Sequence, residues 1–262
     1  MNFSVRGRLR PRTALLVVAA VTAAALPLVA TPDSHGFGTI NGLGQRAEHE
    51  RVTRVALQCS SGTPSNGRCF EPDSLDQLAG EDGSFGAVGS PDNPINADFN
   101  NPDAHCDDAD YMNVAGYPRT RAQATAQFQE CVNHLQNMFE HGLASSPDMI
   151  DDGEIDWDET TLFWDCVFNG QPGRAKCEAL EGFGRALHGA QDFYSHSNWT
   201  DTHDPNRPVS VTNPGGLGRS TQPAFLDLRT EQDISGIIPD GLSTGCYVTD
   251  DQSPGVGACR NR

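Results

Sequence analysis

Residues 185–199 read RALHGAQDFYSHSNW, and this stretch decides the fold that we expect for the chain. It places His188, Asp192 and His196 at positions i, i+4 and i+8. Side chains four residues apart stack on one face of an α-helix. Imidazole nitrogens and carboxylate oxygens that converge on one face are donors that zinc binds well. The sequence therefore predicts a zinc site built on a helix.

The helix that carries this motif is expected to span 174–195 and to lie at the centre of its fold. Its apolar residues recur at helical spacing, as Leu180, Phe183, Leu187, Ala190 and Tyr194. At about 100° per residue, His188 and Asp192 lie roughly 110–150° from the centre of that stripe. The apolar face and the metal-binding face are therefore different, and each is expected to be covered by other parts of the fold. Three glycines cost helix stability, about 1 kcal/mol each. They indicate close approach of neighbouring backbone, and they are Gly182, Gly184 and Gly189.

The rest of the chain predicts a mainly α-helical architecture with long irregular connections. Apolar periodicity predicts helices over 45–58 and 120–143 and a short helix near 160–168. Residues 60–118 are dense in Gly, Pro, Asn, Asp and Ser. A stretch of this length is uncommon in a compact domain unless it has a purpose, and disulfides or metal ligands would order it. Residues 205–262 are rich in Pro and Gly and are expected to be irregular and closed by a disulfide.

Residues 1–30 have the features of a secretory signal peptide. Four arginines form a positive n-region, the apolar run 14–28 has the length of an h-region, and the segment ends in a Leu-Val-Ala cleavage site. A membrane anchor is disfavoured, because the run is short for a span and contains Pro27. We therefore expect a secreted protein, with an α-helical metal-binding domain over 31–204 and with 205–262 as the irregular part of the same domain.

The eight cysteines all follow the predicted signal peptide. An even number of cysteines in a secreted chain indicates disulfides. Zinc–thiolate sites are the alternative, but the sequence contains no Cys-x-x-Cys. Eight cysteines allow about 105 pairings. The spacings favour bonds between neighbours, which would be Cys59–Cys69, Cys106–Cys131, Cys166–Cys177 and Cys246–Cys259.

The net charge of −17 restricts the classes of partner. Removal of residues 1–30, which carry four arginines and no acid, takes the charge to −21. Such a charge suits a soluble secreted protein and argues against nucleic-acid binding, which needs basic surfaces. Many acidic residues lie in 147–160. Their order does not fit the EF-hand pattern, so a solvated acidic turn is favoured over a calcium loop.

Two segments resemble a known family. Residues 187–199, and residues 48–57 in which His49 precedes an apolar-Thr-x-x-Ala-Leu run, resemble the corresponding helices of Het-C-like and zinc-dependent phospholipase C-like proteins. The whole chain is also similar to secreted actinobacterial proteins of the CinY type. The resemblance implies a multi-helix domain of the phospholipase C/P1 nuclease fold with long irregular, disulfide-tied loops.

The resemblance also implies a ligand set for a zinc cluster. His49 takes the role of the histidine on the family's first helix. His188 and Asp192 take the roles on the central helix, and Asp192 bridges two metals. Asp92 and His105 fit the order and approximate spacing of the family's middle Asp and His. The resemblance further implies that Asp92 orients or deprotonates the attacking water.

The chain departs from the family pattern at several points. Asp98 and Asp103 also precede the middle histidine and are alternatives for the middle aspartate. The family's N-terminal Trp, whose amino group binds metal, is missing, and the imidazole of His35 is expected to substitute. His196 comes sooner on the central helix than the family's third histidine, and no His-x3-Glu follows. These departures leave open whether one of three metals is absent or bound differently.

Together these residues predict a secreted zinc-dependent phosphoesterase with one to three zinc ions. Zinc lowers the pKa of bound water, and the resulting hydroxide attacks phosphorus in line. The expected substrate is a phospholipid or other small phosphodiester, with transient contact to a membrane surface. The alternative is a non-catalytic binding or interaction protein that the metal stabilises. A nuclease ranks last, because the chain has a single lysine and few aromatic residues for a single-strand groove.

Overall fold

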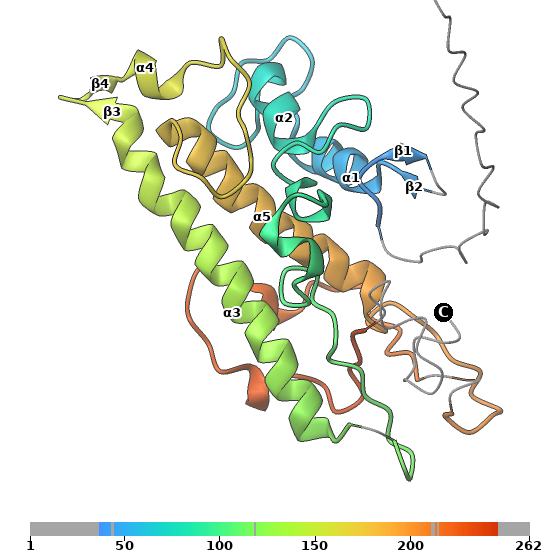
Figure 1. The fold of residues 1–262 in the computed structure, drawn as a ribbon. Helices are drawn as coiled ribbons and strands as arrows, with labels where there is room; N and C mark the ends of the chain where they lie inside the picture. Colours follow the sequence, from blue (N-terminus) through green and yellow to red (C-terminus); the bar gives the residue numbers. More distant parts are fainter. Residues whose placement is uncertain (1–36, 43–44, 118, 211–212, 214, 246–262) are drawn as a thin grey trace, which may run out of the picture. The chain divides into compact units, whose positions relative to one another are not determined.

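The computed structural model describes residues 37–42, 45–117, 119–210, 213 and 215–245 (Figure 1). The chain divides between Pro32 and Asp33 into two units, and every described residue belongs to the second unit. The predicted signal peptide, His35 and the predicted Cys246–Cys259 disulfide lie outside the described residues. Within the described ranges, no helix combines the length and the apolar composition that crossing a membrane requires.

Two long helices, α3 (Arg121–Ser145) and α5 (Ala175–His196), form the framework. They make the most extensive contact between elements in the described part of the chain and lie side by side in Figure 1. α3 begins at a capping box, in which the Thr120 hydroxyl accepts from the Gln123 amide and the Gln123 side chain accepts from the Thr120 amide. The predicted helices over 120–143 and 174–195 are confirmed, with ends that differ by at most two residues.

α5 has a buried polar face and a half-buried apolar stripe. His188 and Asp192 are at most 1% exposed. Side chains from segments far away in sequence cover this face, and they include His49 and His105. The apolar stripe is only half-buried along Phe183, Leu187, Ala190 and Tyr194, which border a groove. The prediction of a central helix with two different covered faces is confirmed, but the polar face is the more deeply buried of the two.

The α5 glycines allow neighbouring backbone to approach closely, as predicted. A Cβ atom on Gly182 would lie 2.5 Å from both the Gly142 amide nitrogen and the Met138 carbonyl oxygen of α3. A Cβ atom on Gly189 would lie 2.6 Å from the Ala104 carbonyl oxygen. Real Cβ atoms do not approach backbone atoms so closely, so these positions require glycine.

Shorter elements surround the helix pair. Three further α-helices are described, α1 (Glu48–Leu57), α2 (Pro72–Ala79) and α4 (Trp157–Thr160). Two antiparallel hairpins are formed by β1 (Asn41–Gly42) with β2 (Gln45–Arg46) and by β3 (Ile150–Asp151) with β4 (Glu154–Ile155). The described 3₁₀-helices are η1 (Ser90–Asp92), η2 (Ala97–Asn100), η3 (Ser146–Met149), η4 (Ala224–Leu226) and η5 (Ile234–Gly236).

The structure tests three predictions for the shorter elements, which concern the helix over 45–58, the irregular stretch 60–118 and the short helix near 160–168. The helix predicted over 45–58 is confirmed as α1, although its first residues form β2 instead. The stretch 60–118 contains α2, which sequence patterning missed. The short helix predicted near 160–168 is wrong, because α4 ends at Thr160 and the following residues are irregular. The apolar side chains that suggested this helix point to solvent rather than to a core.

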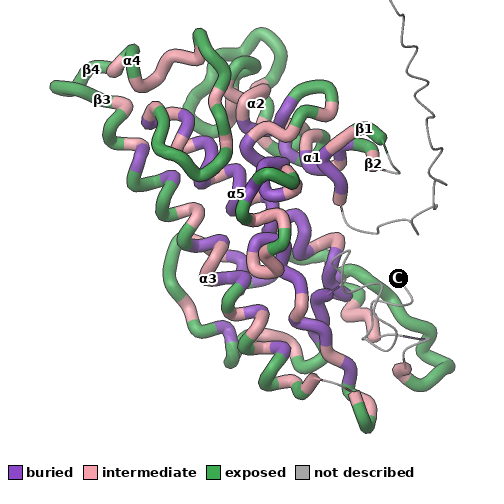
Figure 2. The backbone as a smooth tube through the Cα atoms, in the orientation of Figure 1, coloured by how far each residue is buried: buried purple, intermediate pink, exposed green. Residues whose placement is uncertain are grey.

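The main hydrophobic core joins both long helices to the C-terminal part of the described chain. Its buried residues include Phe128, Val132 and Leu135 from α3, Phe193 from α5, and Trp199, Phe225, Ile234 and Leu242 from the segments that follow. Buried and half-buried stretches also occur in this C-terminal part in Figure 2. The described residues of 205–262 are irregular, as expected, and they complete the core. A second cluster packs α2 against α5 and contains Leu78, Ala87, Val88 and Leu180.

The described cysteines form three disulfides, Cys59–Cys69, Cys106–Cys131 and Cys166–Cys177. All three are the predicted neighbour pairs. Such bonds indicate an extracellular or otherwise oxidising environment. The Cys106–Cys131 bond ties a loop of the irregular stretch 60–118 to α3. Disulfides therefore help to order this stretch, as the sequence predicted.

Candidate metal centre

Five of the predicted ligands converge on the buried polar face of α5. His49 comes from the first turn of α1, Asp92 from the end of η1 and His105 from the loop after η2, while His188 and Asp192 come from α5. The four other side chains are at most 2% exposed, but that of Asp92 is 24% exposed. Segments that are distant in sequence thus meet at one buried cluster that opens towards solvent at Asp92.

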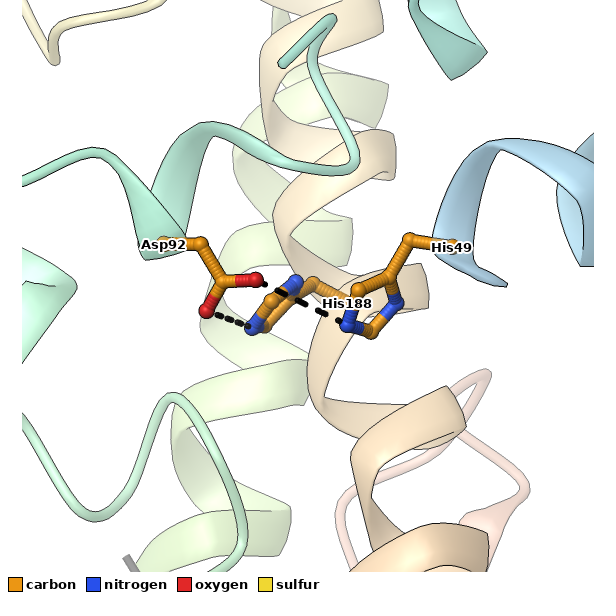
Figure 3. Close-up of side chains that lie close together, drawn as sticks. All are labelled: His49, Asp92 and His188. Atoms are coloured by element: carbon orange, nitrogen blue, oxygen red, sulfur yellow. Dashed lines mark ion pairs between the residues drawn. The ribbon is translucent and has the colours of Figure 1, made fainter. Parts of the chain in front are cut away.

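The first donor group consists of His49, Asp92 and His188 (Figure 3). Asp92 Oδ2 lies 3.9 Å from His49 Nε2, and Asp92 Oδ1 lies 3.6 Å from His188 Nε2. The two imidazole rings are stacked, with their centroids 4.3 Å apart. Both histidines therefore present Nε2 towards the same carboxylate, and the ligand atoms lie within 4.8 Å of one another.

The second donor group consists of His105, His188 and Asp192. Asp192 Oδ2 lies 3.0 Å from His105 Nδ1 and 2.9 Å from His188 Nε2, and these two nitrogens are 3.0 Å apart. Ligand atoms around a tetrahedral ion with bonds of about 2.0–2.1 Å are separated by about 3.3 Å. The three atoms thus have close to the spacing that a four-coordinate metal ion imposes, and His188 belongs to both groups.

Unsatisfied polar atoms in the cluster provide an independent test of whether a metal ion fits. Among the described residues, His49 Nε2 and Asp192 Oδ1 are buried, lie 3.2 Å apart and make no hydrogen bond. A buried polar atom without a partner costs about 1–3 kcal/mol. A cation that binds both atoms would remove this cost. The cluster of buried His and Asp side chains therefore fits a metal ion.

Hydrogen bonds outside the donor groups fix the orientation of two histidine rings. Gln191 Nε2 donates to the Thr53 hydroxyl at 2.9 Å, which leaves Gln191 Oε1 to accept from His49 Nδ1 at 2.9 Å. His49 Nε2 is then the nitrogen available to a metal. His105 Nε2 donates to the Asp98 carbonyl oxygen at 3.2 Å and so presents Nδ1 to the cluster.

A hydroxyl group orients the most exposed carboxylate of the site. Thr39 Oγ1 donates to Asp92 Oδ2 at 2.5 Å, and Thr39 itself is only 2% exposed. The contact joins the segment before β1 to η1 and restricts rotation of the Asp92 side chain. One oxygen of Asp92 is thereby held by the protein, while the other faces His188.

Burial and charge act in opposite directions on the pKa values of the ligands. Burial opposes ionisation of Asp192, but the surrounding histidines outweigh it and hold the pKa of this carboxyl well below its ordinary value. Burial also opposes protonation of His49 and His105, yet Asp192 and Asp92 raise the pKa of both. Burial lowers the pKa of His188, with a contribution from the charge of His49. Asp192 is thus ionised and the neutral form of His188 is favoured, which are the forms that bind a metal, whereas protonated His49 and His105 would release their protons on metal binding.

His196 stands apart from both donor groups. Its Nε2 lies 3.9 Å from Asp192 Oδ1, but its Nδ1 lies 2.9 Å from the buried Asp107 carboxylate. Burial disfavours the imidazolium form, but Asp107 and Asp192 outweigh burial and raise the pKa of His196 to about 10. The structure therefore places His196 beside the cluster as a charged partner of Asp107, and its predicted role as a ligand stays a prediction.

Neither alternative to Asp92 lies in a donor group. Asp98 forms an ion pair with the buried Arg185, which also bonds to Glu181 and Asn96. Burial opposes ionisation of Asp98, but Arg185 and His134 outweigh it and lower its pKa. The Asp103 carboxylate accepts from Gln127 on α3. Of the three candidate aspartates, Asp92 is the one that the structure brings to the histidines.

Sequence reasoning missed the residues that support the ligands. Gln191, Thr53, Thr39 and Asp107 are polar and almost entirely buried, at 8%, 1%, 2% and 1% exposure. Gln and Thr carry no metal-binding signature, and the partners of all four residues are far away in sequence. Gln191 alone offered a signal, because it precedes Asp192 on the polar side of the helix.

The arrangement is capable of binding one or more metal ions, and Asp92 is the partly exposed member of the donor cluster. Imidazole and carboxylate donors of this kind hold transition-metal ions in both structural and catalytic sites. A comparison of the chain with protein-family models, curated proteins and solved structures found no match. The functional interpretation consequently rests on the geometry and chemistry of the cluster.

Proposed function

We propose that the protein is a secreted zinc-dependent phosphoesterase that hydrolyses a phosphodiester in the manner of phospholipase C. The observation that carries the proposal is the asymmetric exposure of the donor cluster. His49, His105, His188 and Asp192 are almost fully buried, whereas Asp92 reaches solvent. Catalytic zinc sites keep one position open for water or substrate, whereas structural sites are closed.

The donor set and the family resemblance support zinc and the phospholipase C/P1 nuclease fold. Three imidazoles and two carboxylates are common ligands of catalytic zinc. His188 is shared by two overlapping donor groups, which supports more than one ion within the proposed range of one to three. The resemblance of the His49 and His188 segments to zinc-dependent phospholipase C-like proteins points to the same metal.

Asp92 carries the proposed catalytic role. Bound zinc would supply Lewis acidity towards a phosphoryl oxygen and would favour ionisation of water near neutral pH. Asp92 accepts the proton of the attacking water, as the new oxygen–phosphorus bond forms and the bond from phosphorus to the leaving alkoxide breaks. The alkoxide then takes a proton from solvent water and leaves as the alcohol. The Thr39 hydroxyl holds Asp92 in place for this transfer. Gln191 keeps His49 in the tautomer that exposes Nε2.

The proposed substrate is a phospholipid or another small phosphodiester, reached by transient contact with a membrane surface. The net charge of −17 and the single lysine disfavour a nucleic-acid substrate. The predicted signal peptide over 1–30 supports secretion. The three disulfides agree with that environment.

The first test is the metal content of the purified mature protein, measured by plasma mass spectrometry. We expect one to three zinc ions per chain, and their loss in His188→Ala/Asp192→Ala. His141→Ala/Asp148→Ala, which changes an exposed pair of the same residue types, is the matched control and keeps the metal. Circular dichroism checks that each variant is folded.

The second test is hydrolysis of bis-p-nitrophenyl phosphate and phosphatidylcholine by the zinc-loaded protein. We expect activity in the wild type and in the control variant. Asp92→Asn is expected to lose activity by about 10²–10⁴-fold, the usual contribution of a general base. A zinc-loaded wild type that cleaves neither substrate would overturn the proposal. Cleavage of single-stranded DNA that disappears in Asp192→Ala would replace the phosphodiester substrate with a nucleic acid.

A second candidate, a non-catalytic interaction protein stabilised by the metal, is favoured by the burial of the ligands. Four of the five donors are at most 2% exposed and connect α1, α5 and the loop after η2. A metal at this point would hold together segments with few hydrophobic contacts. This candidate predicts that chelation destabilises the protein while hydrolysis is absent in every assay.

A further inference from the structure

Residues 146–168 expose an unusual number of large apolar side chains. We call this segment the apolar–acidic face. Six of its large apolar residues are between 52% and 81% exposed, and they are Ile150, Ile155, Trp157, Phe163, Trp164 and Val167. Ile150 and Ile155 are paired across the β3–β4 hairpin, and the rings of Phe163 and Trp164 are in edge contact. Groups of exposed apolar side chains on a soluble protein mark interaction sites.

The backbone of this face is well anchored although its side chains point outwards. The Cys166–Cys177 disulfide joins it to α5, and the Arg174 guanidinium donates to the Trp164 carbonyl oxygen at 2.5 Å. The Gln77 side chain accepts from the Cys166 amide and donates to the Asp165 carboxylate. The apolar side chains are therefore presented on an ordered support, which reduces the entropy cost of binding a partner.

The same face is strongly acidic, although the guanidinium of Arg174 lies against it. Between 146 and 173 the sequence contains eight acidic residues and no Lys, Arg or His. Two of them have structural roles, since Asp156 caps α4 and Glu159 accepts from the first amide of α5. The other six are exposed and make no ion pair with any described residue, and they are Asp148, Asp151, Asp152, Glu154, Asp158 and Asp165.

This combination of apolar and acidic groups determines the kind of partner that fits. A membrane surface is zwitterionic or anionic and opposes insertion of a segment that carries uncompensated carboxylates. A second copy of this chain would bring like charges together, which is unfavourable across an interface. A cationic polypeptide with apolar side chains complements both properties at once.

We propose that the apolar–acidic face docks a basic, amphipathic polypeptide segment of a partner protein. Apolar side chains of that segment pack on Trp157, Phe163 and Trp164, and its lysines or arginines pair with the surrounding carboxylates. The face adjoins the start of α5, about 20 Å along the helix axis from His188. Docking therefore uses a surface separate from the metal centre, and the proposal does not depend on the phosphoesterase activity.

The test uses the full mature protein and a defined probe, a fluorescent amphipathic helical peptide of Lys and Leu with about five helical turns. Binding is followed by fluorescence anisotropy and calorimetry at about 0.15 M salt, where non-specific long-range attraction is screened. Two variants separate the contributions. Trp157→Ser/Phe163→Ser/Trp164→Ser removes apolar groups at unchanged charge, and Asp151→Asn/Asp152→Asn/Glu154→Gln removes charge at unchanged apolar surface.

Each variant has a matched control elsewhere on the surface. Val52→Ser/Val55→Ser/Ile237→Ser removes exposed apolar groups, and Glu81→Gln/Glu231→Gln/Asp240→Asn removes the same number of exposed charges. We expect each face variant to weaken peptide binding at least about tenfold, and each control to change it less than about twofold.

Three outcomes would overturn the proposal. Equal binding by the face variants and their controls would show that the peptide responds only to net charge. Stronger partition to phosphatidylcholine vesicles than to the peptide, lost in the apolar variant, would assign the face to a membrane. Dimerisation of the unliganded protein in light scattering, lost in the same variant, would assign it to a second copy.

Discussion

At the scale of single residues, Gln191 decides which nitrogen of His49 faces the metal centre. Gln191→Leu removes the acceptor of the His49 Nδ1–H and leaves that donor buried without a partner. Groups that orient a ligand in this way usually contribute about 10–100-fold to metal affinity. We expect a loss of that size in zinc affinity, measured by competition with a chromophoric chelator.

A matched variant distinguishes this effect from a general loss of stability. Gln136→Leu changes another largely buried glutamine, which bonds to Glu140 on α3 outside both donor groups. It is expected to leave the zinc affinity within about twofold of wild type. Similar affinities for the two variants and the wild type would show that the Thr53–Gln191–His49 chain does not position the ligand.

The ion pair between His196 and Asp107 is expected to make the stability of the folded protein depend on pH. The pKa of His196 is about 10 in the folded protein and its ordinary value is 6.5. The folded state therefore holds a proton that the unfolded state releases between these values. The resulting stability is fully present below pH 6.5 and is lost as the pH rises towards 10. For one proton the slope is at most about 1.4 kcal/mol per pH unit.

Denaturant unfolding of the metal-free protein at a series of pH values measures this slope. We expect the free energy of unfolding to fall between pH 6.5 and 10 in the wild type. Asp107→Asn removes the main negative charge that stabilises protonated His196. This variant is expected to show a smaller fall in unfolding free energy over that interval. An equally steep decline in this variant would assign the pH dependence to His49 and His105, whose pKa values are also raised.

The candidate ligands were predictable at this scale, but their supporting residues were not. His188 and Asp192 follow from helical spacing, and the structure brings His49, Asp92 and His105 to them. Spacing on one helix cannot show that a chain of hydrogen bonds from Thr53 reaches the site across the fold. His196 shows the same limit, because its position suggests a ligand whereas a distant carboxylate, Asp107, takes its Nδ1.

At the scale of elements, the contact between α3 and α5 depends on paired glycines. Gly182→Ala places a Cβ atom 2.5 Å from the Gly142 amide nitrogen, so the helices must separate or tilt. Alanine is the better helix former by about 1 kcal/mol, but overpacking costs about 1–3 kcal/mol. The clash is with backbone atoms, which cannot move away by changing a rotamer as a side chain can. We therefore expect a net loss of unfolding free energy of about 1–2 kcal/mol.

Guanidinium unfolding of Gly182→Ala checks this prediction, and Gly173→Ala is its control. A Cβ atom on Gly173 would meet no atom closer than 3.9 Å, so the control is expected to change stability by less than about 0.5 kcal/mol. A Gly182→Ala protein as stable as wild type would show that α3 and α5 are able to move apart at little cost.

Apolar periodicity in the sequence predicted the long helices correctly but failed for the short ones. α3 and α5 have many turns over which periodicity accumulates, so both were predicted to within two residues. α2 has only eight residues within a stretch rich in turn formers, and its signal was lost there. The helix predicted near 160–168 failed because Phe163, Trp164 and Val167 face solvent, and periodicity alone does not reveal whether a core is present.

At the scale of the whole molecule, the candidate metal centre connects segments that contribute little to the hydrophobic core. The main core joins α3 and α5 to the C-terminal segments, and the second joins α2 to α5. Leu57 at the end of α1 packs against the second cluster, but neither His49 of α1 nor Asp92 of η1 belongs to either described cluster. His49 and Asp92 reach α5 through the donor cluster, so a bound ion would fasten both segments to the framework.

The corresponding prediction is that zinc raises the melting temperature of the folded protein. An ion that binds only the folded state at about 100 times its dissociation constant stabilises it by about 2.7 kcal/mol. For a unit of this size, each kcal/mol shifts the melting temperature by about 2–4 °C. We therefore expect chelation to lower the melting temperature by about 5–11 °C in scanning calorimetry.

Two variants locate the effect at the proposed centre. His188→Ala/Asp192→Ala is expected to melt at one temperature with and without chelator, because both donor groups are lost. His141→Ala/Asp148→Ala, which removes exposed residues of the same types, is expected to keep the wild-type shift. If chelation leaves the wild-type melting temperature unchanged, the buried His and Asp side chains do not depend on a metal. Direct contacts such as the Gln191–His49 and Thr39–Asp92 hydrogen bonds and the Arg54–Asp76 ion pair would then suffice to hold α1 and η1.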